Sequence, residues 1–219
     1  MFTHQLNIRR TVPTWHAEDS PWKATQILHM LERHTLPLHS ICDVGCGVGG
    51  VLAQLQKSLD QTCTFQGYDV SAHAIEVSKH QENEQLHYEQ RDFSREGKEH
   101  FDLMLLFDVM EHVEDYYSFL RNLQPKATYK MIHVSLELSV LSVFRRNALL
   151  DVRKTFDLHY FTKDLLLAVV SDVGYEVVDY IYTPRAIGVA NNLKKKAMIL
   201  SRRLLFSLNN DVCWADLVC

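Results

Sequence analysis

Short apolar runs alternate with amphipathic stretches along most of the chain, from about residue 40 to about residue 136. Stretches with apolar residues at helical spacing follow several of these runs and end near residues 60, 82 and 123. Continuous apolar runs that alternate with helical stretches are typical of parallel strands covered by helices on both faces of a sheet. The pattern therefore predicts an α/β fold, with strands at residues 41–44, 65–69, 86–91, 101–107 and 131–134.

Both ends of the chain carry elements outside this alternation. Residues 1–19 show no clear periodicity and predict an arm. Asp19 and Ser20, followed by Pro21, are typical of a capped helix start, and the apolar spacing continues to Leu31. Toward the other end, the pattern predicts a helix over residues 165–173 ending at Gly174, a strand over 176–182 stopped by Pro184, a basic helix over 192–208 and a short strand near 214–219.

The most informative run is residues 43–50, DVGCGVGG, in which a strand end carrying Asp43 enters a glycine turn before a helix. Glycines permit positive φ and leave no Cβ between main chain and ligand, so this geometry suits an adenosine-containing cofactor. The spacing alone leaves the cofactor open, because Gly45, Gly47 and Gly50 fit the dinucleotide pattern while Gly45, Gly47 and Gly49 fit a G-x-G-x-G pattern. Asp43 would repel the phosphates of a dinucleotide. It attracts the ammonium and sulfonium of S-adenosylmethionine, which we therefore favour.

Further acids follow the next strands. Asp69 lies about twenty residues after the turn, Asp92 follows the third strand and Asp108 follows the fourth. Together with residues 43–50, these segments resemble the class I S-adenosylmethionine-dependent methyltransferases, and most of all the small-molecule group that includes ubiquinone-type O-methyltransferases. The resemblance covers roughly residues 39–115. Taken singly, each acid also fits a turn or a helix start, but all of them occur in the family's order.

The resemblance implies a Rossmann-like, seven-stranded, mostly parallel sheet with helices on both faces and an antiparallel last strand. It assigns Asp69 to the ribose hydroxyls and Asp92 to the adenine amino group, with neighbouring apolar side chains flanking the ring. The segment that begins at Asp108 would close over the methionine end of the cofactor. The residues expected to bind S-adenosylmethionine are Asp43, Gly45, Cys46, Gly47, Gly49, Asp69, Val70, Asp92, Phe93, Asp108 and Val109.

The length of 219 residues suits a single domain with a large core. Residues 1–37 would form an N-terminal arm and helix, and residues 38–136 the cofactor-binding core. Residues 137–161 break the alternation just after the fifth strand, where an insertion is expected to shape the substrate pocket. Residues 162–219 would supply the C-terminal helices and strands.

The composition limits the binding partners, metal sites and cellular compartment to be expected. The chain is 47% hydrophobic with a net charge of −4, so it is globular and carries no overall field that attracts nucleic acid. Five cysteines without a C-x-x-C pair argue against a disulfide framework and a zinc site, and no spacing indicates another metal. No signal peptide or long apolar run is present, and we expect a cytoplasmic protein. The basic stretch at residues 192–208 fits a membrane-surface helix, but we favour a packed helix with a solvated basic face.

Three histidines are candidates for the general base that would take a proton from the acceptor: His112, His133 and His159. His112 follows the fourth strand and is the first choice. His133 alternates with core residues of the fifth strand, so packing is an equally good interpretation. His159 precedes a helix and also fits a residue that bonds the main chain there.

The sequence therefore predicts an enzyme that transfers a methyl group from S-adenosylmethionine to a small-molecule acceptor, giving S-adenosylhomocysteine. Two alternatives stay open, a non-catalytic protein that binds S-adenosylmethionine and a nicotinamide-dependent oxidoreductase. The acceptor, the atom that is methylated and the oligomeric state do not follow from the sequence.

Overall fold

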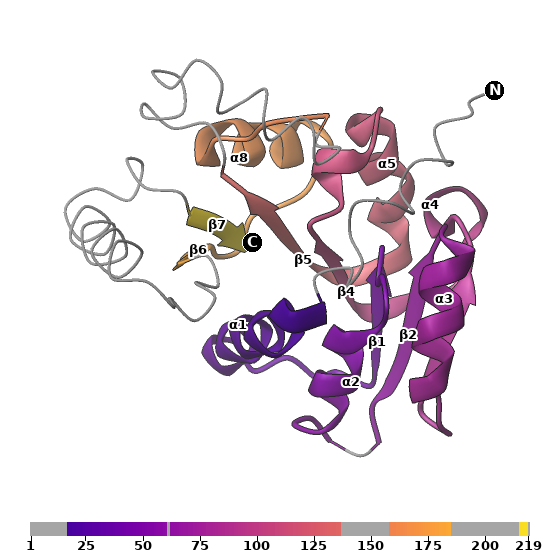
Figure 1. The fold of residues 1–219 in the computed structure, drawn as a ribbon. Coiled ribbons are helices and arrows are strands. Elements are labelled where there is room, and N and C mark those ends of the chain that lie inside the picture. The colour runs from indigo at the N-terminus through magenta and orange to yellow at the C-terminus, as the bar shows by residue number, and fades with distance from the viewer. Residues whose placement is uncertain (1–16, 61, 137–157, 185–214, 219) are drawn as a thin grey trace, which may run out of the picture. The chain divides into compact units, whose positions relative to one another are not determined.

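The computed structural model describes residues 17–60, 62–136, 158–184 and 215–218 (Figure 1). The chain divides into two compact units. The first runs to Leu105 and includes Lys126–Tyr129, and the second comprises Leu106–Pro125 and the chain from Lys130 onward. None of the helices in the described ranges is long and apolar enough to cross a membrane.

The first unit begins with helix α1 (Ser20–Arg33), which follows a short 3₁₀ turn, η3 (Ala17–Asp19). Strand and helix then alternate as the sequence predicts, and Figure 1 shows this part in indigo to magenta. The elements are β1 (Ser40–Val44), α2 (Gly50–Gln56), β2 (Thr64–Asp69), α3 (Ala72–Ser78), η4 (Lys79–Gln81), β3 (Leu86–Gln90), α4 (Phe93–Glu96) and β4 (Phe101–Phe107).

These strands pair in parallel in the order β3-β2-β1-β4. Asp43 is opposite Gly67 on one side and Leu105 on the other, so it lies on the central strand of this group. All the carboxyl ends lie at one edge of a parallel sheet, which is where open α/β sheets bind their ligands. The register thereby brings the ends of β1 and β2 together.

The core of the first unit is closed by aromatic rings as well as aliphatic side chains. Phe93 is fully buried and stacks on Tyr68 with ring centroids 4.3 Å apart, and Phe101 packs edge-on against both rings. The Lys126 ammonium donates to the carbonyls of Phe93 and Ser94 at 2.6 and 2.8 Å. This cluster fixes the chain just after β3.

The second unit contains the turn η5 (Met110–His112), helix α5 (Tyr116–Leu123), most of β5 (Ala127–Ser135), helix α8 (Lys163–Asp172) and the strands β6 (Ile181–Pro184) and β7 (Ala215–Val218). Pro125 lies in the turn η6 (Gln124–Lys126), where α5 stops as expected. Thr162 caps α8 by accepting the Leu165 N–H, and Gly174 follows the helix with φ of 88°. β7 pairs antiparallel with both β5 and β6.

Several predicted element boundaries differ from the structure. β5 begins at Ala127 and not at residue 131, and the strand expected at residues 176–182 begins only at Ile181 and includes Pro184. The four residues of β6 are those that pair with β7. Asp19 was expected to cap α1, but it belongs to η3 and its side chain makes no capping bond. The N-terminal arm up to residue 16, most of the insertion at 137–161 and the basic stretch at 192–208 lie outside the described residues.

Candidate functional site

The glycine turn after β1 has the positive-φ conformation that its sequence predicts. Gly45, Gly47 and Gly49 have φ angles of 84°, 53° and 81°, a region that other residues adopt at a cost. The Tyr68 carbonyl on β2 accepts the N–H groups of Gly45 and Cys46 at 2.7 and 3.0 Å. The main chain of the turn is thereby tied to the neighbouring strand and held in one shape.

Asp69, the last residue of β2, joins this turn to the segment that follows β2. Its Oδ2 accepts the Gly47 N–H at 2.9 Å and its Oδ1 accepts the Ser71 N–H at 2.8 Å. Burial raises the pKa of the Asp69 carboxyl, although these main-chain hydrogen bonds act in the opposite direction. A carboxylate offers about four lone-pair sites, so Asp69 keeps acceptor capacity for the hydroxyls of a ribose.

Asp43, two residues before Gly45 on β1, adds a second carboxylate next to the turn. Its side chain is buried on β1. The pKa of the Cys46 thiol is raised well above its usual value by burial first and then by the charges of Asp43 and Asp69. Both carboxylates therefore act on the same turn, and their field favours a cation and opposes an anion. This agrees with the interpretation of Asp43 from the sequence.

Tyr88 on β3 contacts the glycine turn through its hydroxyl and its ring, and it was not among the predicted site residues. Its hydroxyl donates to the Gly49 carbonyl at 2.7 Å. A Cβ on Gly49 or on Gly67 would lie within 2.6 Å of the Tyr88 ring, so both glycines are required by its position. Gln81 adds a further support by donating to the Val48 carbonyl at 2.7 Å. The only sequence signal was the inward alternation of Leu86 and Tyr88 on β3.

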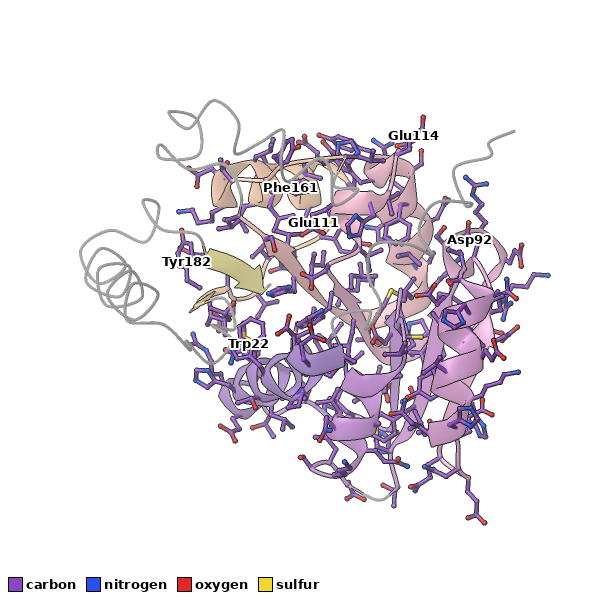
Figure 2. All side chains as sticks on the ribbon, viewed as in Figure 1. Trp22, Asp92, Glu111, Glu114, Phe161 and Tyr182 are labelled. Carbon is purple, nitrogen blue, oxygen red and sulfur yellow. The ribbon has the colours of Figure 1, made fainter. Side chains whose placement is uncertain are left out.

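The residues expected around an adenine ring have different environments. Val70 is 56% exposed directly after Asp69, which makes its side chain available to a ligand. Asp92 accepts a hydrogen bond from the Ser94 hydroxyl at 2.6 Å and pairs with Arg95 (labelled Asp92, Figure 2). Phe93, which is expected among the cofactor-binding residues, is fully buried, and its side chain stacks on Tyr68.

In the second unit, the turn after β4 is bonded to β5 through Asp108. The Asp108 carboxylate lies 2.8 Å from His133 Nδ1, and its main-chain N–H donates to the His133 carbonyl at 3.1 Å. Asp108 has a φ of 56°, the one positive value at a non-glycine residue in the described ranges. Such backbone strain persists where surrounding contacts hold it, often at functional sites.

His133 is itself buried, and its ring stacks on Phe107 at 5.0 Å between centroids. Glu111 lies in the same turn as Asp108 and is also buried, with Oε1 accepting the Ser135 N–H at 2.7 Å. The sequence around Glu111 gives no indication that this side chain is buried.

A family model described as "Methyltransferase domain" matches residues 15–180, more than half of the chain. The chain belongs to this methyltransferase family. The family is one of class I S-adenosylmethionine-dependent enzymes, so the predicted donor is confirmed at the level of the family. The nicotinamide alternative finds no support in the match.

Individual relatives agree with the family. The methyltransferase is 29% identical over 82 residues to the mitochondrial ubiquinone biosynthesis O-methyltransferase of Candida albicans, an alignment that covers 34% of this chain and 25% of the relative. The matched segment thus spans about a quarter of that relative's length.

Solved structures show the fold. The structure of the plantazolicin methyltransferase BpumL in complex with SAH matches 98% of this chain and 90% of its own, at 17% identity and a TM-score of 0.63. A SAM-dependent methyltransferase from Archaeoglobus fulgidus matches 92% and 96% at 14% identity, with a TM-score of 0.60. These likenesses confirm an α/β, Rossmann-like methyltransferase fold.

The three candidate histidines of the methyltransferase have different surroundings. His159 Nε2 lies 2.9 and 3.2 Å from the carbonyls of Val113 and Glu114, which is the main-chain role that the sequence left open. His133 is buried against Phe107 and paired with Asp108. His112 is exposed on η5. Of the three, His112 is the most exposed.

Proposed function

We propose that this chain transfers a methyl group from S-adenosylmethionine to a small-molecule acceptor. The observation that carries the proposal is the Asp69 carboxylate, which bonds the Gly47 N–H at 2.9 Å beside a turn that also lies above buried Asp43. This arrangement offers paired acceptors for a ribose and a negative field for a cationic donor. Family membership supports the same reaction.

The residues of the chain have separate tasks in this reaction. S-adenosylmethionine, when bound, supplies a methyl group on a sulfonium that is already a good leaving group. Asp69 would hold the ribose, Val70 would lie against the adenine and the main chain at Gly45 and Gly47 would approach the methionine part. Holding donor and acceptor in line lowers a barrier by about 7–11 kcal/mol for a well-placed pair.

For an acceptor hydroxyl, we propose His112 as the base that removes the proton. It is exposed, and it lies on the turn that the family resemblance assigns to the methionine end of the cofactor. Replacing it by glutamine is expected to lower turnover, because an amide cannot accept the proton that the imidazole would take. Equal turnover by the variant and the wild type would exclude His112 as the base.

The first experiment is a calorimetric titration with S-adenosylhomocysteine, with NAD as the parallel ligand. We expect binding in the micromolar range, on the order of −8 kcal/mol, for S-adenosylhomocysteine and none for NAD. Binding of NAD alone would overturn the proposal. If neither ligand binds, the protein should be denatured and any ligand released from it identified.

A non-catalytic protein that binds S-adenosylmethionine is the second candidate. It is favoured by the engagement of His133 with Asp108 and of His159 with main-chain carbonyls, because both rings already have hydrogen-bond partners within the protein. Turnover on a panel of phenols, carboxylic acids and amines separates the two functions. The curated relative carries the name of an O-methyltransferase, so hydroxyl acceptors come first in the panel.

The proposal also covers the number of strands in the sheet, the cellular compartment and the class of substrate. We propose one domain whose strands form a single seven-stranded sheet with β7 antiparallel, as the family resemblance implies. The pairing of β7 with β5 and β6 supports it. We also propose a cytoplasmic enzyme that does not act on nucleic acid, in keeping with a net charge of −4.

A further inference from the structure

We propose that Glu111 works as a neutral, protonated carboxyl group that positions the turn after β4, and that it loses this role when it ionises. The inference deepens the proposed function and rests on it, because this turn carries Asp108, Val109 and His112. Glu111 is a positioning residue in this scheme and does not touch the donor or the acceptor.

Glu111 connects three segments of the second unit. Its Oε1 accepts the Ser135 N–H at the end of β5 at 2.7 Å. Its main-chain carbonyl accepts the N–H groups of Leu158 and His159, which lead into α8, at 2.7 and 3.2 Å. The side chain is 3% exposed, whereas Glu114 lies at the surface three residues later (both labelled in Figure 2).

The surroundings of Glu111 favour its neutral form. Burial raises the pKa of the Glu111 carboxyl to about 8, with the neighbouring Asp108 charge as the second cause. The titratable groups that face it are Asp108 on its own turn, His133 on β5 and, from the segment before α8, His159, whose ring is directed to main-chain carbonyls. His133 acts in the opposite direction and lowers the pKa, but less strongly.

Ionisation would loosen the turn for a physical reason. Glu111 Oε2 is buried and has no hydrogen-bond partner among residues 17–60, 62–136, 158–184 and 215–218. A buried negative charge on Glu111, next to the charge of Asp108, is costly unless it is paired. Since Asp108 is held in its strained conformation by contacts to β5, we expect loss of the Glu111 proton to displace both residues together.

The stability of the protein should therefore depend on pH in a particular direction. Between the ordinary pKa of glutamate and the raised one, the folded chain binds a proton that the unfolded chain does not, so stability falls as pH rises. In denaturant titrations from pH 6 to pH 8, we expect the folding equilibrium constant of the wild type to fall by about tenfold or more relative to Glu111→Gln, since one bound proton corresponds to about tenfold per pH unit. Glutamine keeps an acceptor for Ser135 and an N–H donor in place of the acid O–H.

Glu114→Gln is the matched control, because it removes an exposed carboxyl from the same loop. Its pH dependence should follow the wild type. If the folding equilibrium constants of the wild type and Glu111→Gln changed in parallel with pH, the proposal would be overturned. If Glu111→Gln does not fold, infrared spectra of the wild type decide the matter: a protonated-carboxyl band at pH 7 that weakens near pH 8 is expected, and its absence would overturn the proposal.

The unfolding experiment needs no donor or acceptor, so its outcome is independent of the proposed methyl transfer. A wild type that binds no S-adenosylhomocysteine at any pH would remove the proposed function and leave the titration of Glu111 intact. With an active acceptor in hand, Glu111→Gln should also retain turnover above pH 8 better than the wild type does. Loss of turnover in Glu111→Gln at all pH values would show that the anion is the working form, which contradicts the proposal.

Discussion

Replacing Asp69 by alanine is expected to weaken the binding of S-adenosylhomocysteine by more than about tenfold. The carboxylate bonds the main chain on both sides, at Gly47 and Ser71, and keeps acceptor capacity for the ribose hydroxyls. One hydrogen bond to a charged group contributes about 1.5–3 kcal/mol, and about 1.4 kcal/mol is tenfold in affinity. Calorimetric titration of the variant measures the effect directly.

Asp102→Ala is the matched control for Asp69→Ala. Asp102 also accepts two main-chain N–H groups, from His39 and Ser40 at 2.7 and 2.9 Å, but it does so at the other end of β1. Its replacement should lower stability and leave the affinity for S-adenosylhomocysteine close to that of the wild type. Equal affinities for Asp69→Ala and the wild type would remove the ribose assignment.

The features that could be predicted from the sequence are those whose contacts are local or are set by the order of the strands. The glycine turn follows from residues that are adjacent in the chain. The carboxyl ends of parallel strands meet at one edge, and Asp69, which the family resemblance assigns to the ribose, lies there beside Gly47. The end of helix α5 near residue 123 was predicted because its apolar spacing is also a local signal.

The residues that were missed or misplaced depend on packing between distant segments. Tyr88 supports Gly49 only because β3 pairs with β2 in one register, which no local pattern specifies. Phe93 is predicted among the cofactor-binding residues, and its burial depends on stacking against Tyr68 from another strand. Glu111 has the sequence context of an exposed turn acid, and its burial depends on contacts with β5 and with the residues before α8.

Replacing Gly49 by alanine is expected to destabilise the protein more than any other single methyl group added to the turn. A residue with a Cβ at φ of 81° costs about 1–2 kcal/mol. The new Cβ would also lie 2.5 Å from the Tyr88 ring, and overpacking of a filled site costs about 1–3 kcal/mol. The sum, about 2–5 kcal/mol, should appear as a lower denaturant midpoint in equilibrium unfolding.

Gly174→Ala separates the two contributions to this loss. Gly174 has a φ of 88°, so alanine there meets the same backbone cost, but its Cβ would face only the end of the Gln124 side chain at 3.0 Å. We therefore expect Gly174→Ala to lose about 1–2 kcal/mol and Gly49→Ala to lose clearly more. Equal losses at the two positions would mean that the Tyr88 ring yields without cost. Tyr88 would then not be the rigid support that holds the cofactor turn in shape.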